Sequence, residues 1–168
     1  MRPGRDADVA PLRLIRNEPG VIRWWNAPEP GDVEAQVHGT DPDVASLTIE
    51  VDGEVAGLIQ YGQESAPEYR HANIDIYLGA AFQGRGIGAL AVWLLARYLF
   101  DQAGHHRITI DPEAANERAI RCYGRVGFRP VGVLRRYQRL DDGTWADGML
   151  MDLLAGELVR PADAESGA

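Results

Sequence analysis

The stretch Gln83-Gly84-Arg85-Gly86-Ile87-Gly88 joins two segments of different periodicity. Residues 72–78 before it alternate polar and apolar side chains, which is typical of a β-strand. After it, one helical spacing connects the apolar residues Ile87, Leu90, Ala91, Leu94, Leu95, Tyr98 and Leu99. Glycines at a strand-to-helix junction let backbone N–H groups approach a ligand, and the first N–H groups of a helix favour anions. The stretch therefore predicts a site for a phosphate or pyrophosphate.

Two nucleotide-binding motifs with similar glycines fit this stretch poorly. The phosphate-binding loop of NTPases ends in Gly-Lys-Ser/Thr, whereas this one continues as Gly86-Ile87-Gly88-Ala89, without the lysine or the hydroxyl. A dinucleotide-binding fold requires repeated βαβ units after the glycines, and too little of the chain follows them. A tight turn that serves packing alone stays open as an alternative.

A second segment with a distinctive pattern comprises residues 116–128. It reads Asn116-Glu117-Arg118-Ala119-Ile120-Arg121-Cys122-Tyr123-Gly124-Arg125-Val126-Gly127-Phe128. The Gln-x-x-Gly-x-Gly pattern that begins at Gln83 is similar to the acyl-CoA pyrophosphate loop of the GNAT superfamily of N-acyltransferases, and residues 116–128 resemble that superfamily's second cofactor segment. Three further segments resemble the aminoglycoside 6′-N-acetyltransferases within it: Trp24-Trp25, Ile74-Asp75 and Asp111-Pro112.

The resemblance implies an α+β fold of the GNAT type, which is one domain with a mixed, mostly antiparallel central sheet flanked by helices. Local patterns predict helices at 6–15, 32–38, 87–103 and 116–126, and strands at 46–51, 54–61, 72–78, 106–110, 128–140 and 144–154. Asp6 or Asp8 is expected to cap the first helix and Asp32 the second. We expect the domain to span residues 1–158, with 159–168 as a disordered tail. The family's usual first strand precedes the helix at 6–15, so it is either very short here or the natural start lies upstream of Met1.

Composition limits the classes of protein and partner. The chain has 168 residues, 45% of them hydrophobic, which suffices for one core. A net charge of −8 disfavours nucleic acid and suits a cationic acceptor. The sequence has no apolar run long enough to span a membrane, and its single cysteine, Cys122, fits a reducing cytoplasm. The four histidines lack metal-ligand spacing, so we predict no metal; a monomer and a homodimer both stay open.

Asp75 is the candidate for holding and deprotonating an acceptor amine. N-acyl transfer from a thioester needs a neutral amine, an oxyanion donor and a proton for the leaving thiolate. A carboxylate in the middle of a strand is costly to bury unless it is paired, which indicates a cation or a proton as its partner. An unperturbed aspartate is a poor base for an ammonium group, so Asp75 needs a raised pKa or a water chain. An internal ion pair with an arginine is the structural alternative.

Tyr123 is the candidate general acid for the leaving thiolate. Proton transfer from a tyrosine to a thiolate like that of coenzyme A is uphill by about 2 kcal/mol, which is small within a catalysed barrier. Tyr123 also falls on the inward stripe of its helix, so a packing role is the alternative. A backbone N–H near Leu78 or Gly79 is the expected oxyanion donor. Cys122 has no base at obvious reach and is expected to be structural.

The resemblance implies binding roles for two further groups of residues. Those expected to bind the co-substrate acetyl-CoA are Leu78, Gln83, Gly84, Arg85, Gly86, Ile87, Gly88, Ala89 and Asn116. Those expected to bind the acceptor are Trp24, Trp25, Gln60, Asp75 and Asp111. Asn116 is first of all a natural helix cap, and a tryptophan pair is more often part of a core than a platform for sugar rings. Asp111 either binds a second ammonium group or only turns the chain.

The predicted function is transfer of an acetyl group from acetyl-CoA to a primary amine, by direct transfer in a ternary complex. The 6′-amine of an aminoglycoside antibiotic is the expected acceptor. An acyltransferase for a siderophore precursor or a polyamine-like metabolite is the alternative enzyme. A non-catalytic protein that binds acyl-CoA or drug is the alternative from another class.

Overall fold

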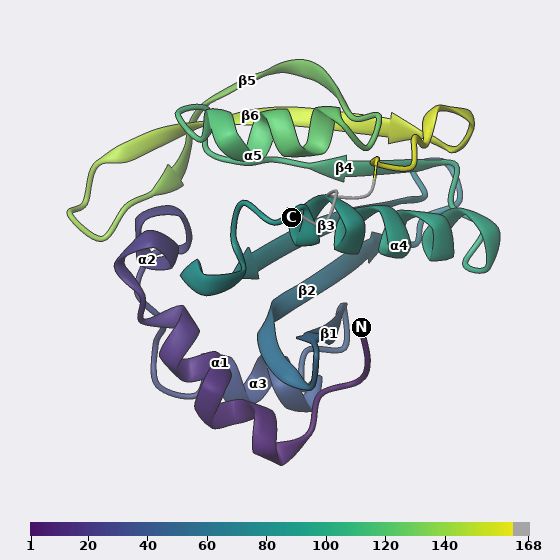
Figure 1. The fold of residues 1–168 in the computed structure, drawn as a ribbon. Coiled ribbons are helices and arrows are strands. Elements are labelled where there is room, and N and C mark those ends of the chain that lie inside the picture. The colour runs from purple at the N-terminus through teal and green to yellow at the C-terminus, as the bar shows by residue number, and fades with distance from the viewer. Residues whose placement is uncertain (163–168) are drawn as a thin grey trace.

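The computed structural model describes residues 1–162, which form one sheet with helices on both faces (Figure 1). The strands are β1 (Val44–Val51), β2 (Glu54–Glu64), β3 (His71–Leu78), β4 (Arg107–Ile110), β5 (Arg129–Arg139) and β6 (Trp145–Leu154). Within the described residues the six strands follow the order β1-β2-β3-β4-β6-β5, and only β3 and β4 pair in parallel. The predicted mixed, mostly antiparallel sheet is therefore confirmed.

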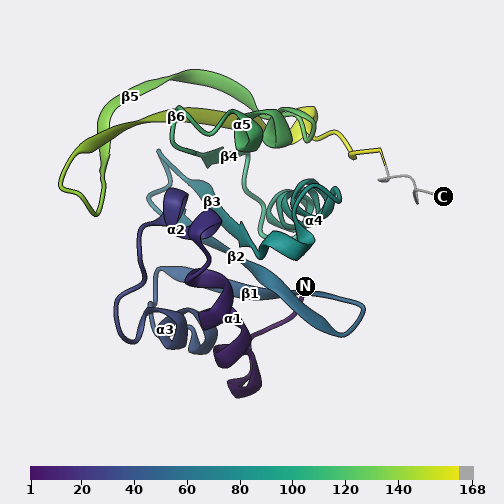
Figure 2. The same ribbon diagram turned by 60° about the vertical axis from the view of Figure 1, so that its left-hand side comes forward.

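The helices form a layer on each face of the sheet (Figure 2). One layer holds α1 (Val9–Arg16), α2 (Pro19–Trp25) and α3 (Asp32–His38), and the other holds α4 (Ile87–Asp101) and α5 (Glu117–Gly124). Each face has its own core, with Leu12 and Leu58 in the first and Leu95 and Leu153 in the second. The strand expected before the first helix is a single β-bridge, in which Arg2 exchanges backbone hydrogen bonds with Thr48.

The face of α4 that packs on the sheet only partly coincides with the predicted one, with which it shares Ala91, Leu95 and Leu99. Leu90 and Tyr98 are 41% and 48% exposed, whereas Val92 and Ala96 are fully buried. Because α4 is apolar on more than one side, two sets of residues at helical spacing compete, and periodicity alone does not decide between them. Small alanine side chains let the helix approach the sheet; the buried residues of α4 are Ala89, Ala91, Val92, Leu95, Ala96 and Leu99.

Asp8 and Asp32, which are predicted as helix caps, do not cap their helices with their side chains. Asp8 stands at the N-cap position of α1, but its carboxylate accepts hydrogen bonds from Arg2 at 2.6 and 2.8 Å and from Thr48 at 3.0 Å. These bonds, those of Arg2 foremost, lower the pKa of Asp8 to about 2. Asp32 lies one residue inside α3, whose N-cap is Gly31.

The sequence patterns do not predict α2. The helix signal in this segment is little more than Pro19 at its first position.

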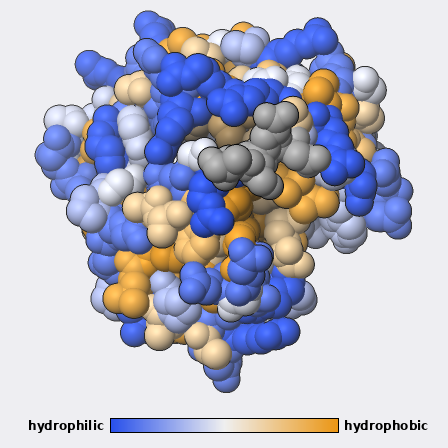
Figure 3. Space-filling model, in the orientation of Figure 1, coloured by the Kyte–Doolittle hydropathy of each residue, from blue (hydrophilic) through white to orange (hydrophobic). Residues whose placement is uncertain are grey.

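The C-terminal segment contacts the domain past the predicted boundary at residue 158. Val159 donates its backbone N–H to Val126, and the guanidinium of Arg160 lies 5.5 Å from the ring of Trp93. The remainder of the predicted tail, residues 163–168, lies outside the described residues. Among residues 1–162, no helix is both long and apolar enough to cross a membrane. Hydrophilic side chains cover much of the rim of the face drawn in Figure 3.

The sheet opens between β3 and β4, and this opening positions the site. The two strands pair only through Ala72 with Ile108 and Asn73 with Thr109, and then they separate (Figure 1). The rest of β3 stays paired with β2, and among residues 1–162 no strand pairs with its other side. Because strand side chains alternate between faces, an opening in the middle of a sheet lets one cavity contact residues from both faces.

Candidate active site

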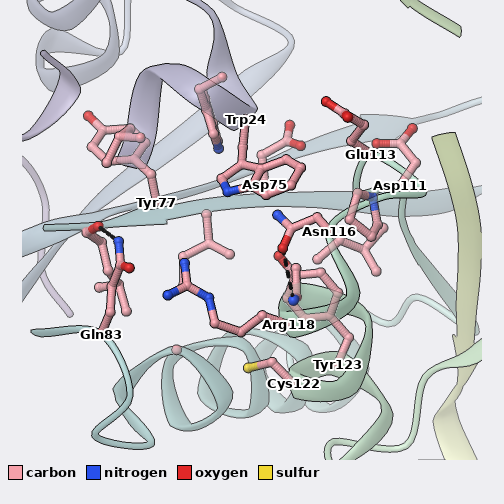
Figure 4. A pocket seen from close by; sticks show the side chains of 18 of the residues that line it. Trp24, Asp75, Tyr77, Gln83, Asp111, Glu113, Asn116, Arg118, Cys122 and Tyr123 are labelled. Atoms are coloured by element: carbon pink, nitrogen blue, oxygen red, sulfur yellow. Dashed lines mark hydrogen bonds between the residues drawn. The ribbon is translucent and has the colours of Figure 1, made fainter. Parts of the chain in front are cut away.

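A cavity of about 590 Å³ occupies the opening between β3 and β4. Residues from α2, both strands, the glycine-rich turn, α4, α5 and β5 line it. In Figure 4, Asp111 and Glu113 lie toward one side of the view and Gln83 toward the other, with Asp75 and Trp24 between them. The volume suits a site for small molecules, most of which bind in concave pockets of a few hundred cubic ångströms.

The glycine-rich turn presents uncapped backbone N–H groups to one end of this cavity. Gly86 is the N-cap of α4 with a φ of +77°, a conformation that favours glycine, and no side chain of the described residues caps the helix. The first N–H groups of α4 are therefore open to a ligand at the positive end of the helix dipole. Arg118 of α5 and Arg125, which directly follows this helix, line the same cavity and add positive charge. This set of donors fits a pyrophosphate.

Most residues predicted to bind the co-substrate line the cavity: Leu78, Gln83, Gly84, Gly86, Gly88, Ala89 and Asn116. The amide of Gln83 donates to the carbonyl of Leu78 at 2.7 Å and so ties the turn to the end of β3. Asn116 caps α5 as predicted, because its side chain accepts from the N–H of Ala119 at 3.1 Å. Arg85 and Ile87 do not line the cavity.

The two predicted oxyanion donors differ in their hydrogen bonding. The N–H of Gly79 donates to the carbonyl of Ala56 at 2.9 Å, which extends the β2–β3 pairing. Leu78 lies opposite Gly57 in that register. Since successive residues of an antiparallel strand direct their N–H groups to opposite sides, the N–H of Leu78 points away from β2, toward the opening. Leu78 is thus the better candidate.

Asp75 lines the cavity from the middle of β3. Within the described residues it has no ion pair, and its side-chain partner is the amide of Gln60, with 3.5 Å between Nε2 and Oδ2. Burial raises the pKa of Asp75 to about 6, and the negative charge of Asp111 contributes to the rise. A carboxylate with this pKa is ionised at neutral pH and accepts a proton more readily than an ordinary aspartate. This is the shift that the predicted base role requires.

Tyr123 reaches the cavity from the opposite face of the sheet. Its ring packs against Phe128 with 6.2 Å between centroids, and within the described residues its hydroxyl has no hydrogen-bond partner. Burial raises the pKa of Tyr123 well above its usual value, and the neighbouring Cys122 and the carboxylate of Asp75 add to the rise. The hydroxyl therefore stays protonated as a donor, while full proton transfer to a thiolate is further uphill than the sequence suggests. Burial likewise raises the pKa of the Cys122 thiol, which disfavours a nucleophilic role.

The tryptophan pair combines packing with exposure to the cavity. Both side chains line it. Trp25 packs edge-on against Tyr77 with 5.0 Å between centroids, and the buried guanidinium of Arg16 lies 5.2 Å from its ring. Trp24 is stacked by Arg23 at 4.2 Å. Trp25 is therefore partly a core residue, and Trp24 is the freer aromatic surface.

The acidic end of the cavity includes two residues that the sequence does not indicate. Tyr137 of β5 donates its hydroxyl to Asp111 at 2.6 Å, a bond that contributes most to raising the pKa of Tyr137 to about 12. The buried carboxylate of Glu113 accepts hydrogen bonds from both terminal nitrogens of Arg23, at 2.9 and 3.0 Å. This bidentate pair connects α2 with the segment after β4. Gln60, in contrast, lies behind Asp75 and does not line the cavity.

The Acetyltransferase (GNAT) family model matches residues 13–128. This chain belongs to the GNAT family. It is 30% identical over 146 residues to the aminoglycoside N(6′)-acetyltransferase type 1 of Klebsiella pneumoniae, which covers 76% of this chain and 72% of the relative. It is 27% identical over 140 residues to the spermidine N(1)-acetyltransferase of Escherichia coli, covering 80% and 74%. A solved structure of aminoglycoside acetyltransferase AAC(6′)-Ib with coenzyme A and kanamycin matches with a TM-score of 0.75 and 26% identity, covering 93% and 94%.

As a GNAT protein, the chain is an acetyl-CoA-dependent N-acetyltransferase. Acetyl-CoA supplies the thioester, and the uncapped start of α4 together with Arg118 and Arg125 suits its phosphates. In the part of the chain that the structure describes, no three His, Cys, Asp or Glu side chains come together as a metal site.

Gly88→Val is expected to weaken acetyl-CoA binding by about tenfold or more while the protein stays folded. A Cβ at position 88 would meet Leu78 at 3.5 Å and Cys122 at 3.7 Å, which are ordinary contacts. The valine methyl groups would then obstruct the first turn of α4. Calorimetric titration with acetyl-CoA measures the change, with Gly132→Val as the control, because that glycine lies on β5 with nothing within 4 Å of a Cβ. Unchanged affinity in folded Gly88→Val would contradict the assignment of the turn.

Proposed function

We propose that this enzyme acetylates the 6′-amine of an aminoglycoside and thereby confers resistance to it. The observation that carries the proposal is the acceptor end of the cavity, where the indole of Trp24 lies near two carboxylates, Asp75 and Asp111, that are not neutralised by an ion pair within the described residues. A flat apolar ring surface suits a sugar ring, and separate carboxylates suit the several ammonium groups of an aminoglycoside. Glu113 is already paired with Arg23 and contributes less charge to an acceptor.

The proposed roles of the residues follow from their positions. Asp75 binds the reacting ammonium group and accepts its proton, since its carboxylate is ionised above about pH 6. The N–H of Leu78 donates to the carbonyl oxygen as negative charge develops there. Tyr123 donates a hydrogen bond from its hydroxyl group to the leaving sulfur. Asp111 holds a second ammonium group, with Tyr137 fixing the orientation of its carboxylate.

A polyamine or siderophore-precursor acetyltransferase is the second candidate. The similarity to a spermidine acetyltransferase supports it, and a linear polyamine would also satisfy Asp75 and Asp111. Such an acceptor has no ring to place on Trp24, so the aromatic surface favours the aminoglycoside. The single thiol of the chain and the dependence on acetyl-CoA support a cytoplasmic location.

A panel of acceptors tests this proposal directly. In a thiol-release assay with acetyl-CoA, kanamycin and tobramycin, which carry a 6′-amine, are expected to be acetylated, and an analogue with a 6′-hydroxyl is expected to be inert because it lacks the nucleophile. Mass spectrometry of the product locates the acetyl group. Acetylation of both members of a pair would refute the regiochemistry. Preferential turnover of spermidine would favour the second candidate, and binding without turnover of any amine would favour a non-catalytic protein.

A further inference from the structure

A chain of side-chain hydrogen bonds connects Asp75 with Tyr77 through two glutamines. Gln60 of β2 donates to Asp75 at 3.5 Å, Gln36 of α3 donates from Nε2 to Oε1 of Gln60 at 3.3 Å, and the hydroxyl of Tyr77 donates to Oε1 of Gln36 at 3.2 Å. Gln36 and Gln60 do not line the cavity. Contact with an acceptor therefore does not explain why glutamines occupy these two positions.

The ionised carboxylate fixes the direction of every bond in this chain. A carboxylate only accepts, so Gln60 must present its NH₂ group to Asp75 and its carbonyl oxygen to Gln36. Gln36 must in turn present its NH₂ group to Gln60, which leaves its carbonyl oxygen to accept from Tyr77. If any one amide turned over, two carbonyl oxygens or two NH₂ groups would face each other.

Tyr77 is a fixed donor at the far end of the chain. Its side chain is buried, and burial raises its pKa far above the usual value, so the hydroxyl keeps its proton. Its ring is held between neighbours, edge-on to Trp25 with 5.0 Å between centroids and 5.5 Å from the guanidinium of Arg16. The donor therefore has a defined position, which orients the amide of Gln36.

The other groups around Asp75 do not supply this contact. The charged and titratable residues that line the cavity with Asp75, or pair with such a residue, come from every element around it: Asp111 after β4, Glu113 with its partner Arg23, Arg118, Cys122 and Tyr123 of α5, Arg125 beyond it, Tyr137 of β5, and Tyr77 of β3 itself. Within the described residues none of them donates a hydrogen bond to Asp75. Burial and Asp111 oppose ionisation of Asp75, whereas the bond from Gln60 favours it.

We propose that Gln36, acting through Gln60 and anchored by Tyr77, is a positioning residue that keeps the Asp75 carboxylate ionised and oriented. The inference rests on the proposed function, because it assumes that Asp75 must be ionised to accept a proton from the amine. Through these hydrogen bonds α3, none of whose residues lines the cavity, influences the protonation state of Asp75, the candidate base. An uncharged donor also leaves the full negative charge of Asp75 available to an ammonium group, as a paired arginine would not.

Titration of the Asp75 carboxyl carbon by NMR tests this inference without requiring turnover. With ¹³C-labelled aspartate, and with Asp75→Asn to assign the signal, the midpoint is expected near pH 6 in the unmodified enzyme. In Gln60→Met and Gln36→Met it is expected to rise by about 0.5–1 pH unit, because the carboxylate loses an oriented donor. The acid limb of the pH profile of kcat/KM is expected to move in the same direction. Gln63→Met is the matched control, since Gln63 lies on β2 but bonds to His105, outside the chain.

Gln36→Glu is the second variant, because it keeps the size of the side chain but cannot donate to Gln60. It is expected to raise the midpoint at least as much as Gln36→Met. Midpoints that stay unchanged in folded Gln36 and Gln60 variants would overturn the inference, whatever happens to the melting temperature. If the midpoint moves while Asp75→Asn keeps full activity, the hydrogen-bond chain stands and the proposed role of Asp75 fails. If the midpoint is unmoved while Asp75→Asn is inactive, only the inference fails.

Discussion

Asp75→Asn is expected to lower kcat/KM for the amine by about 10²–10⁴-fold, the range for loss of a general base, while the Kd of acetyl-CoA stays within a few-fold. Asparagine keeps the size and the hydrogen bond from Gln60 but removes the charge and the proton acceptor. In the unmodified enzyme, activity should fall as the pH drops through about 6, because Asp75 becomes protonated there. This acid limb should be absent from the residual activity of Asp75→Asn. Steady-state rates within a few-fold of the unmodified enzyme would contradict a catalytic role.

The thermal stability of the same variant separates a functional carboxylate from a structural one. The folded-state pKa of Asp75 lies above that of an unfolded aspartate, so its contribution to stability is complete below about pH 4 and is lost as the pH rises through about 6. At neutral pH the ionised carboxylate therefore costs stability, on the order of 1–3 kcal/mol. Asp75→Asn should keep or raise the melting temperature at neutral pH. A carboxylate held in a structural ion pair would give a clear decrease instead.

The features that the sequence predicts correctly are those with local causes. The hairpin between β1 and β2 follows from Asp52-Gly53, whose φ values of +51° and +84° belong to the tight turn that these residues favour. Gly127, three residues past the end of α5, has a φ of +113°, a conformation that favours glycine. Each of these positions demands a residue type that can be recognised without knowledge of the rest of the chain.

The features that the sequence leaves undecided depend on distant parts of the chain. Nothing near Ala72 or Ile108 indicates that two parallel strands pair through two residues each and then separate, although this opening forms the cavity. The pairing of Arg23 with Glu113 joins segments with no common pattern. Asp75 could be singled out because a carboxylate is unexpected in a central strand, whereas Gln36 lies on an ordinary amphipathic helix and shows its relation to Asp75 only in three dimensions.

Tyr123→Phe is expected to lower kcat by about 10–10²-fold with little change in the KM of the amine, because phenylalanine keeps the packing against Phe128 and loses only the donor. Since the hydroxyl of Tyr123 has no hydrogen-bond partner within residues 1–162, its removal should leave the melting temperature unchanged. Steady-state kinetics with acetyl-CoA and a saturating amine measure the loss. A normal kcat would reduce Tyr123 to a packing residue.

The choice of acyl donor shows whether Tyr123 acts on the leaving sulfur. The raised pKa of Tyr123 favours donation of a hydrogen bond to that sulfur over complete transfer of the proton. A thioester whose leaving thiolate is less basic needs this donor less, so the ratio of unmodified to Tyr123→Phe rates should shrink toward one as the pKa of the thiol falls. Tyr137→Phe is the matched control, because Tyr137 also lines the cavity but bonds to Asp111. That variant should alter the KM of the amine and show the same dependence on the thiol as the unmodified enzyme. An equal loss of rate in Tyr123→Phe with every donor would instead place the effect of Tyr123 before cleavage of the thioester, in the geometry of the bound acetyl group.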